Sequence, residues 1–343
     1  MNQIPVLDIK GDYRGVGAAI GEQFSESIKN SIEKRKIEIP NYDKYLEKSK
    51  EYFAYTKTIF PNLIDETEAI ANSANVDVFD YFFINNREAY DVAEQYDKKE
   101  AVNFDHCTVA VSFGKDGVIV GHNEDWSIDA LNELYILKAK IGDKSFIGLN
   151  YKGGIAGLSA SMNNYGLVQC INDLYQKNQF GVPKNYLARA ILECKSLDDA
   201  ENLIRNTKRA SGFNHVLAQG NEVRNIEIAG DKMAVDKLIS MPYVHTNHYT
   251  SPEMKSLEKF HTKSSESRYK RAKKLVRNDM ELKDMGKLLS DREDIQFPIC
   301  RADATIGSVI AIPQKNEFWV SYGHPCEHEY IEYQNGQYSK AIK

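Results

Sequence analysis

The chain has 343 residues, of which 42% are hydrophobic and 27% charged, so neither a disordered chain nor a fibrous repeat is expected. Its formal net charge of −5 and its pI near 6.0 argue against nucleic acid or an anionic membrane as the main partner, because both need concentrated positive charge. No secretory signal and no run of eighteen apolar residues is present, so we expect a cytoplasmic protein that spans no membrane. Small molecules or peptides remain as partners.

The first hundred residues carry helical patterns. Apolar residues recur every four positions after Val16, on one stripe of an amphipathic helix: Ile20, Phe24, Ile28 and Ile32. Further helices are predicted over 42–58, 62–75 and 78–96, the second of which begins just after Pro61. We therefore expect a helical N-terminal segment.

After Phe104 the pattern changes to short β-rich runs separated by Gly, Asn or Asp turns. The predicted strands are 107–114, 117–124, 133–141, 145–150, 155–161, 166–171, 214–219, 223–229, 232–239, 304–312 and 317–322. Helices are predicted from Pro183, from Leu197 and over 264–278 and 282–290. Runs of strands with helices gathered between them favour an α+β layered fold over a doubly wound sheet.

The stretch from Cys107 to Asp125 is predicted to form a β-hairpin. Two runs rich in Val and Ile flank a Gly-Lys-Asp-Gly turn at 114–117, which is the usual signal for antiparallel strands joined by a short loop. The hairpin brings Cys107, at the head of the first strand, beside Asp125, at the end of the second. A cysteine in a Val-rich strand is most often a small buried hydrophobe. Cys107 differs because it begins its strand next to polar residues, so we interpret it as a candidate nucleophile.

The remaining cysteines do not indicate a disulfide framework or a metal site. The chain has five cysteines and no Cys-x-x-Cys pair. His245 and His248 lie three apart and Cys326 lies two before His328, but zinc needs three or four converging ligands. The residues around His245 argue for a strand end, where these two side chains would not share a helix face. We therefore expect no metal and no cofactor.

Several motifs, in order along the chain, resemble the acyl-CoA:6-aminopenicillanic acid acyltransferase family (peptidase C45-like), whose members are related to the choloylglycine hydrolases. The hairpin carries the first of them, Cys107-Thr108-Val109-Ala110-Val111 and Gly121-His122-Asn123-Glu124-Asp125-Trp126. The others are Asp12-Tyr13-Arg14-Gly15-Val16-Gly17, Val244-His245-Thr246-Asn247-His248-Tyr249, Ser267-Arg268-Tyr269-Lys270-Arg271, Pro298-Ile299-Cys300-Arg301 and Gly323-His324-Pro325-Cys326. The resemblance spans nearly the whole chain.

The resemblance implies an N-terminal-nucleophile hydrolase fold, a four-layer αββα sandwich of two antiparallel sheets. It also implies that the bond between His106 and Cys107 is cleaved autocatalytically. Residues 1–106 would then form one subunit and residues 107–343 the catalytic subunit, within one structural domain. The freed α-amine of Cys107, with an ordinary pKa of about 7.7–8.0, would serve as the base for its own thiol. The cleaved N-terminal fragment would thus be a partner of the catalytic part.

By the same resemblance, Asp125 would hold the α-amine and Asn247 would donate its amide to the oxyanion. Arg268 would stabilise the thiolate or orient the substrate, with Arg301 as a second candidate for that role. Two residues depart from related patterns: His122 stands where choloylglycine hydrolases carry arginine, and His106 stands where a small residue is expected. The bile-salt specificity is therefore not transferred to this chain.

The leading hypothesis is an autoprocessed cysteine amidohydrolase that acts on linear amide C–N bonds of a small N-acylated compound through an acyl-thioester on Cys107. The first alternative is an acyltransferase that moves an acyl group from a thioester donor to an amine. The second is an uncleaved, non-catalytic binding protein with the same fold. The substrate-binding residues and the oligomeric state, including a homo-oligomer, stay open.

Overall fold

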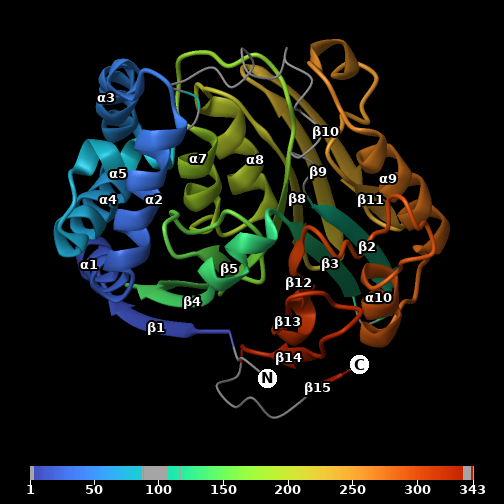
Figure 1. Cartoon of the computed structure of the whole chain (residues 1–343). Helices are drawn as coiled ribbons and strands as arrows, with labels where there is room; N and C mark the ends of the chain where they lie inside the picture. Colours follow the sequence, from blue (N-terminus) through green and yellow to red (C-terminus); the bar gives the residue numbers. More distant parts are fainter. Residues whose placement is uncertain (1–3, 87, 89–106, 116, 335–340, 343) are drawn as a thin grey trace.

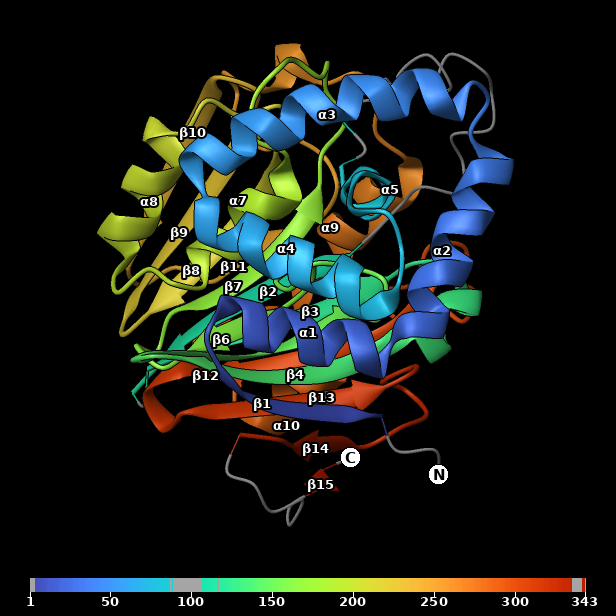
Figure 2. The same cartoon turned by 90° about the vertical axis from the view of Figure 1, so that its left-hand side faces the viewer.

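The computed structural model describes residues 4–86, 88, 107–115, 117–334 and 341–342. Two β-sheets lie face to face, with helices on both outer faces (Figure 1 and Figure 2). This arrangement confirms the α+β class and the four-layer αββα sandwich. Among the described residues, no helix is both long and apolar enough to cross a bilayer.

The first sheet has eight strands in the order β1-β4-β5-β6-β7-β8-β9-β10. Their bounds are β1 (Val6–Gly11), β4 (Leu134–Ile141), β5 (Lys144–Tyr151), β6 (Ser161–Asn163), β7 (Val168–Asp173), β8 (Phe213–Gln219), β9 (Glu222–Ala229) and β10 (Lys232–Leu238). Its strands pair antiparallel except for β1, which the sequence pattern did not reveal and which runs parallel to β4.

The second sheet has seven strands in the order β11-β2-β3-β12-β13-β14-β15, all paired antiparallel. Their bounds are β2 (Thr108–Gly114), β3 (Gly117–Asp125), β11 (Tyr243–His245), β12 (Thr305–Ile312), β13 (Glu317–Tyr322), β14 (Tyr330–Glu332) and β15 (Ala341–Ile342). The predicted hairpin is therefore confirmed as β2 and β3, in which Thr108 pairs with Asn123.

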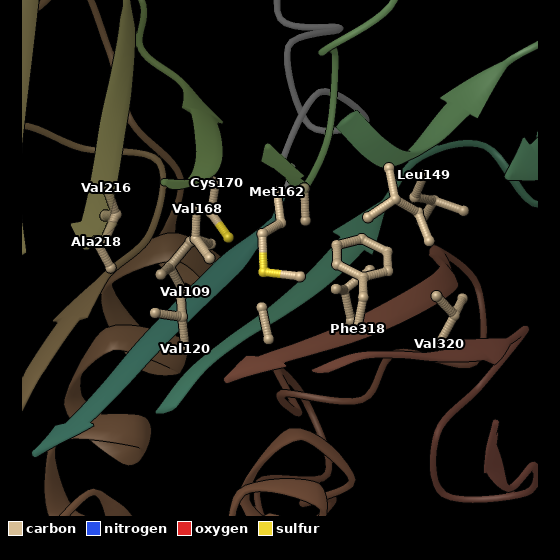
Figure 3. Close-up of a cluster of buried hydrophobic side chains, with 14 of the residues drawn as sticks. Val109, Val120, Leu149, Met162, Val168, Cys170, Val216, Ala218, Phe318 and Val320 are labelled. Carbon is tan, nitrogen blue, oxygen red and sulfur yellow. The ribbon is translucent and has the colours of Figure 1, made fainter. Parts of the chain in front are cut away.

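The core between the sheets is built by alternate residues of the facing strands. Val109 of β2 and Val120 of β3 meet Val168 and Cys170 of β7, and Phe318 of β13 continues the same layer (Figure 3). Successive side chains of a strand point to opposite faces, so the intervening residues face the outer helices. This alternation determines which polar residues near Cys107 point between the sheets.

Helices cover both outer faces. On the first sheet lie α1 (Tyr13–Gln23), α2 (Ser25–Glu38), α4 (Pro61–Ala74), α7 (Lys184–Ile191) and α8 (Leu197–Asn206), with α3 (Tyr42–Ile59) and α5 (Val78–Ile84) packed over them. On the second sheet lie α9 (Lys263–Leu275) and α10 (Leu282–Leu289). Figure 1 shows the blue N-terminal helices and the orange α9 and α10 at opposite sides of the molecule.

Three sequence predictions need correction. The helical stripe after Val16 belongs to two helices, because the chain bends at Phe24, where φ is −118° and ψ is 23°. The predicted strand 155–161 is wrong, since 155–160 are irregular and Gly157 adopts a left-handed φ of 89° while its N–H donates to Asn150. The helix predicted over 78–96 ends at Ile84, because the side chain of Asn85 bonds the backbone of Tyr81, Gly153 and Ile155; residues 87 and 89–96 lie outside the described part.

Candidate functional site

Cys107 stands directly before β2, at the edge of the space between the two sheets. Its side chain is buried, and its backbone has a φ of 69°. A left-handed conformation in a non-glycine residue costs on the order of 1–3 kcal/mol and persists only where the surroundings enforce it. The backbone at the predicted nucleophile is therefore strained.

The surroundings of Cys107 keep its thiol protonated. Burial is the main cause that raises its pKa well above the usual value, and the carboxylates of Glu124, Asp125 and Asp173 add to the increase. The backbone N–H of Asp125 donates to the sulfur and opposes the increase only in part. Because the thiolate is the nucleophilic form, a nucleophilic role for Cys107 would need a base close by.

Asp125 ends β3 beside Cys107, as the hairpin predicted. Its Oδ1 accepts a hydrogen bond of 2.6 Å from the hydroxyl of Thr305 on β12. The same Thr305 oxygen accepts the backbone N–H of Arg301 at 2.8 Å. The backbone of Arg301 therefore helps to position Thr305, which in turn supports Asp125. The guanidinium of Arg301 donates to Asp303.

Arg268 forms hydrogen bonds to several residues of the predicted site. Its Nη1 donates to the carbonyl of Cys107 and to Oγ1 of Thr108, both at 2.7 Å, and its Nη2 donates to Oδ1 of Asn247 at 3.0 Å. Its Nε donates to Ser264 one helical turn earlier at 3.2 Å. Most cations of this helix were expected to be solvated, and Arg268 is the exception because it is fully buried.

Asn247 lies in the loop after β11, and each part of it is bonded. Its backbone N–H donates to the hydroxyl of Ser265 at 2.8 Å, and its Oδ1 accepts from Arg268. Its Nδ2 donates to the carbonyl of Asp173 at 3.2 Å, which uses one of the two N–H groups of the amide. The structure thus brings Cys107, Asn247 and Arg268 into one hydrogen-bonded unit.

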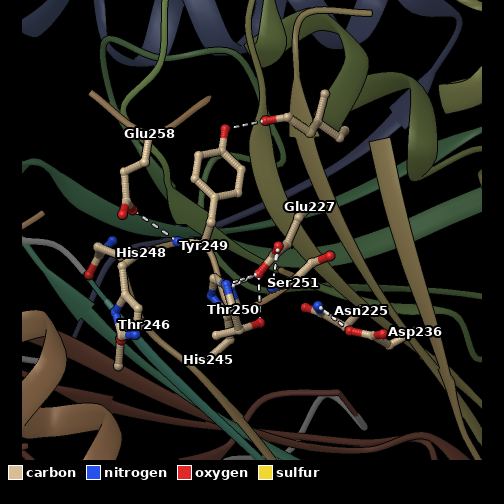
Figure 4. Close-up of polar contacts among 12 residues, drawn as sticks. Asn225, Glu227, Asp236, His245, Thr246, His248, Tyr249, Thr250, Ser251 and Glu258 are labelled. Carbon is tan, nitrogen blue, oxygen red and sulfur yellow. Dashed lines mark hydrogen bonds and ion pairs between the residues drawn. The ribbon is translucent and has the colours of Figure 1, made fainter. Parts of the chain in front are cut away.

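Glu227 anchors the loop that carries Asn247 (Figure 4). Its carboxylate accepts bonds from His245 at 3.0 Å, from the backbone and hydroxyl of Thr250 at 2.6 and 2.7 Å, and from the backbone of Ser251 at 3.0 Å. Burial raises its pKa, but these donors outweigh that effect and lower the pKa to about 2. A fully paired carboxylate under the loop fixes where the Asn247 amide is presented.

The histidines that the sequence raised as metal candidates bond separate partners. His245 bonds Glu227, whereas Nδ1 of His248 bonds Ser265 at 2.8 Å. Cys326 instead approaches Cys300, with 2.9 Å between the two sulfurs. The pairing of Cys300 with Cys326 was not foreseen from their spacing.

A second polar group, to which the sequence motifs assigned no role, lies beside Cys107. His122 and Glu124 lie on the same face of β3, and a nitrogen of His122, an oxygen of Glu124 and the sulfur of Cys107 lie within 4.8 Å of one another. Nε2 of His122 lies 3.0 Å from Oε2 of Glu124, and Tyr151 on β5 donates to Oε1 at 2.6 Å. His122, Glu124 and Tyr151 are engaged with one another in hydrogen bonds, so we assign no metal to this cluster.

Two buried asparagines were also missed. Asn172 on β7 pairs directly with Asn214 on β8, and the side-chain amide atoms of both are buried with no hydrogen-bond partner among the described residues. The alternation of β7 places Asn172 on the same face as Val168 and Cys170, between the sheets. The signal in the sequence that could have found them is an asparagine at the alternating inward position of each strand, near the end of β7 and near the start of β8.

The comparison with protein families matches residues 112–325 to the model described as acyl-coenzyme A:6-aminopenicillanic acid acyl-transferase. The chain belongs to this family. The match contains Asp125, Asn247 and Arg268, whereas Cys107 lies five residues before its start (112 − 107).

Among known proteins, this family member is similar to beta-alanyl-dopamine/carcinine hydrolase of Drosophila melanogaster, with 25% identity over 222 residues. The similar region covers 59% of this chain and 57% of that relative, so the chain spans less than two thirds of the relative's length. Two solved structures of conjugated bile acid hydrolase variants from Clostridium perfringens are also similar. They have 12% and 14% identity and TM-scores of 0.49 and 0.48, and the similarity covers 69% of this chain and 96% and 97% of theirs.

Proposed function

We propose that this protein is a self-processing cysteine hydrolase that cleaves linear amide C–N bonds of a small N-acylated compound. The observation that carries the proposal is the unit around Cys107, in which Arg268 joins the nucleophile's carbonyl to Asn247 while the Asp125 backbone contacts the sulfur. Membership in the acyl-transferase family supports the same chemistry, because acyl transfer and amide hydrolysis share an acyl-enzyme.

Self-cleavage would remove the bond between His106 and Cys107 and create the catalytic amine. His106 lies outside the described residues, so support for cleavage comes from Cys107, whose strained backbone and place at the head of β2 suit a chain terminus. The fragments 1–106 and 107–343 would stay together as one structural domain. Glu66 on α4 forms a buried ion pair of 2.7 Å with Arg189 on α7, which would join them.

In turnover, the α-amine would take the thiol proton, and the sulfur would attack the carbonyl carbon of the substrate. The oxyanion would be stabilised by the Asn247 amide, with the buried amide of Asn172 as a further donor. The amine would then protonate the leaving nitrogen, the C–N bond would break, and an acyl-thioester would remain on Cys107. Asp125 would hold the amine throughout, and water would release the acid.

Acyl transfer differs only in the last step, where an amine instead of water would attack the thioester. The family description favours this second function, because it names an acyl-transferase. The ratio of amide product to acid product at increasing amine concentration distinguishes the two functions.

For the substrate, the curated relative suggests where to start. Its name specifies beta-alanyl-dopamine and carcinine, so we propose small amides of an amino acid with an amine as the first compounds to test. N-acyl amino acids, acyl-dipeptides and β-lactams complete the panel. Release of free amine is the measurement.

The decisive experiment compares the wild type with Cys107→Ala. Purified wild-type protein should separate into two fragments on a denaturing gel, and Cys107 should be the N-terminal residue of one of them. Cys107→Ala should stay whole and inactive. A whole wild-type chain that hydrolyses amides fully would contradict the mechanism. A whole chain that is inactive, and whose Cys107 resists a small electrophile, would support the uncleaved binding protein instead.

A further inference from the structure

The pair formed by His122 and Glu124 has the geometry of a base and its orienting acid. Both side chains are buried and lie two residues apart on β3, so they share the face that looks toward the first sheet. Nε2 of His122 lies 3.0 Å from the carboxylate, and Tyr151 holds the other carboxylate oxygen at 2.6 Å. The acid is thus fixed from β5, across the gap between the sheets.

The hydrogen bond to Glu124 assigns the tautomer of His122. A carboxylate accepts hydrogen bonds, so in the neutral ring that pairs with it Nε2 carries the hydrogen and Nδ1 carries the lone pair. Nδ1 is buried and has no hydrogen-bond partner among the described residues. The ring therefore keeps one nitrogen available to accept a proton.

This ring lies beside the nucleophile. The ligand atoms of Cys107, His122 and Glu124 all lie within 4.8 Å of one another. One ring nitrogen of His122 thus lies within 4.8 Å of the sulfur, and a rotation of the ring or one intervening water molecule lets the nitrogen with the lone pair reach the thiol. Cys107 as nucleophile, His122 as base and Glu124 as orienting acid therefore have the same arrangement as the three groups of other sites with an activated nucleophile.

The uncut chain needs such a base. Before cleavage, the nitrogen of Cys107 belongs to a peptide bond and cannot take a proton from the thiol. Burial and the carboxylates of Glu124, Asp125 and Asp173 meanwhile raise the pKa of that thiol, so the sulfur is protonated near neutral pH. The α-amine proposed for turnover exists only after the first cut.

We propose that His122, oriented by Glu124, accepts the thiol proton of Cys107 in the uncut chain and returns it to the leaving nitrogen during self-cleavage. The proposal rests on the proposed function. The thiolate attacks the carbonyl carbon of His106, the proton passes from His122 to the Cys107 nitrogen, and the C–N bond breaks. A thioester then joins residue 106 to the sulfur, and water hydrolyses it to a free thiol and a carboxylate. The net reaction consumes one water molecule.

The test separates maturation from turnover in the full-length chain. General base catalysis typically contributes about 10²–10⁴-fold, so His122→Gln should slow the appearance of the two fragments by at least about 100-fold. Turnover per cleaved molecule should change by less than about tenfold, because the α-amine then serves as base. Fragment formation after synthesis is followed by intact mass and denaturing gel, and activity is divided by the cleaved fraction.

His215→Gln is the matched control. His215 is equally buried, but it bonds Gln169 at 3.2 Å on the face of the first sheet that carries α7, away from Cys107. This variant should cleave at the wild-type rate. Added imidazole should partly restore cleavage to His122→Ala, a response that a purely structural defect would not give.

Each outcome of these experiments either supports or overturns the proposed role of His122. Any of three results would overturn the role of His122. His122→Gln could cleave at the wild-type rate, it could lose cleavage and per-molecule turnover equally, or a chelator could stop cleavage of the wild-type chain. If His122→Gln does not fold, Tyr151→Phe should slow cleavage by about three- to tenfold through the loss of one hydrogen bond to Glu124, and an unchanged rate would overturn the role. A wild-type chain that never cleaves would instead refute the proposed function.

Discussion

Replacing Arg268 tests whether one buried cation organises the whole site. Arg268→Met removes the donor to the Cys107 carbonyl at 2.7 Å and the donor to the Asn247 amide oxygen at 3.0 Å. A buried acceptor left unsatisfied costs about 1–3 kcal/mol, so two of them should cost about 4 kcal/mol of the free energy of unfolding. The hydroxyls of Thr108 and Ser264 can rotate toward other partners and add little.

Activity should fall together with stability. Asn247 would lose the bond that orients its amide, and loss of one oxyanion donor typically lowers kcat about 10²–10³-fold. Arg268→Lys keeps the charge but lacks the planar fork that reaches two acceptors at once. We therefore expect it to lose about 2 kcal/mol of the free energy of unfolding and to lose activity to a similar extent as Arg268→Met.

The measurement is equilibrium unfolding in urea in a Cys107→Ala background, where the chain stays whole, and the urea midpoints of the variants are compared. Turnover is measured with Cys107 present. Arg271→Met is the control, since this arginine on the same helix is partly exposed and pairs with Asp291 and Glu293. It should lose at most about 1 kcal/mol. An Arg268→Met protein within 1 kcal/mol of its parent and within about threefold of its kcat would refute the reasoning.

Three further predictions concern other parts of the fold. Glu66→Leu or Arg189→Met alone breaks a buried ion pair and should lower the free energy of unfolding by about 3–5 kcal/mol. The double variant should lose clearly less than the sum of the two single losses. Additive losses in a double-mutant cycle measured in urea would contradict this. Oxidised glutathione should link Cys300 and Cys326, whose sulfurs lie 2.9 Å apart, by a disulfide that peptide mapping detects; independent alkylation of both after oxidation is the contrary result. The pKa of Glu227 is lowered to about 2, so its stabilising contribution is present above its unfolded pKa of about 4.3 and is lost as pH falls toward 2. The stability difference between wild type and Glu227→Gln should therefore shrink across that window, and a difference that stays constant would argue against it.

Local sequence patterns determined the central hairpin. Alternating apolar residues and a turn with Gly117 at a φ of 106° are short-range features, so β2, β3 and the approach of Cys107 to Asp125 could be predicted. The same patterns misled at 155–161, where an apolar composition suggested a strand. The conformation of Gly157 and its bond to Asn150 prevent one there.

Contacts between distant segments were decided only by the tertiary structure. Arg268 stands among solvated cations of one helix, and nothing in that helix distinguishes it except the position of its side chain against Cys107 and Asn247. The approach of Tyr151 to Glu124 depends on how the two sheets face each other.

The sequence by itself thus determined the family motifs, the layered fold class and the position of the candidate nucleophile, because each depends on spacing along the chain. The tertiary structure alone decided which polar groups surround Cys107, because burial and hydrogen bonding join residues far apart in the chain, such as Cys107 and Arg268, which are 161 positions apart. His122 illustrates the difference. In the sequence it is a substitution for an arginine, and in the fold it is a buried ring close to both an acid and a thiol.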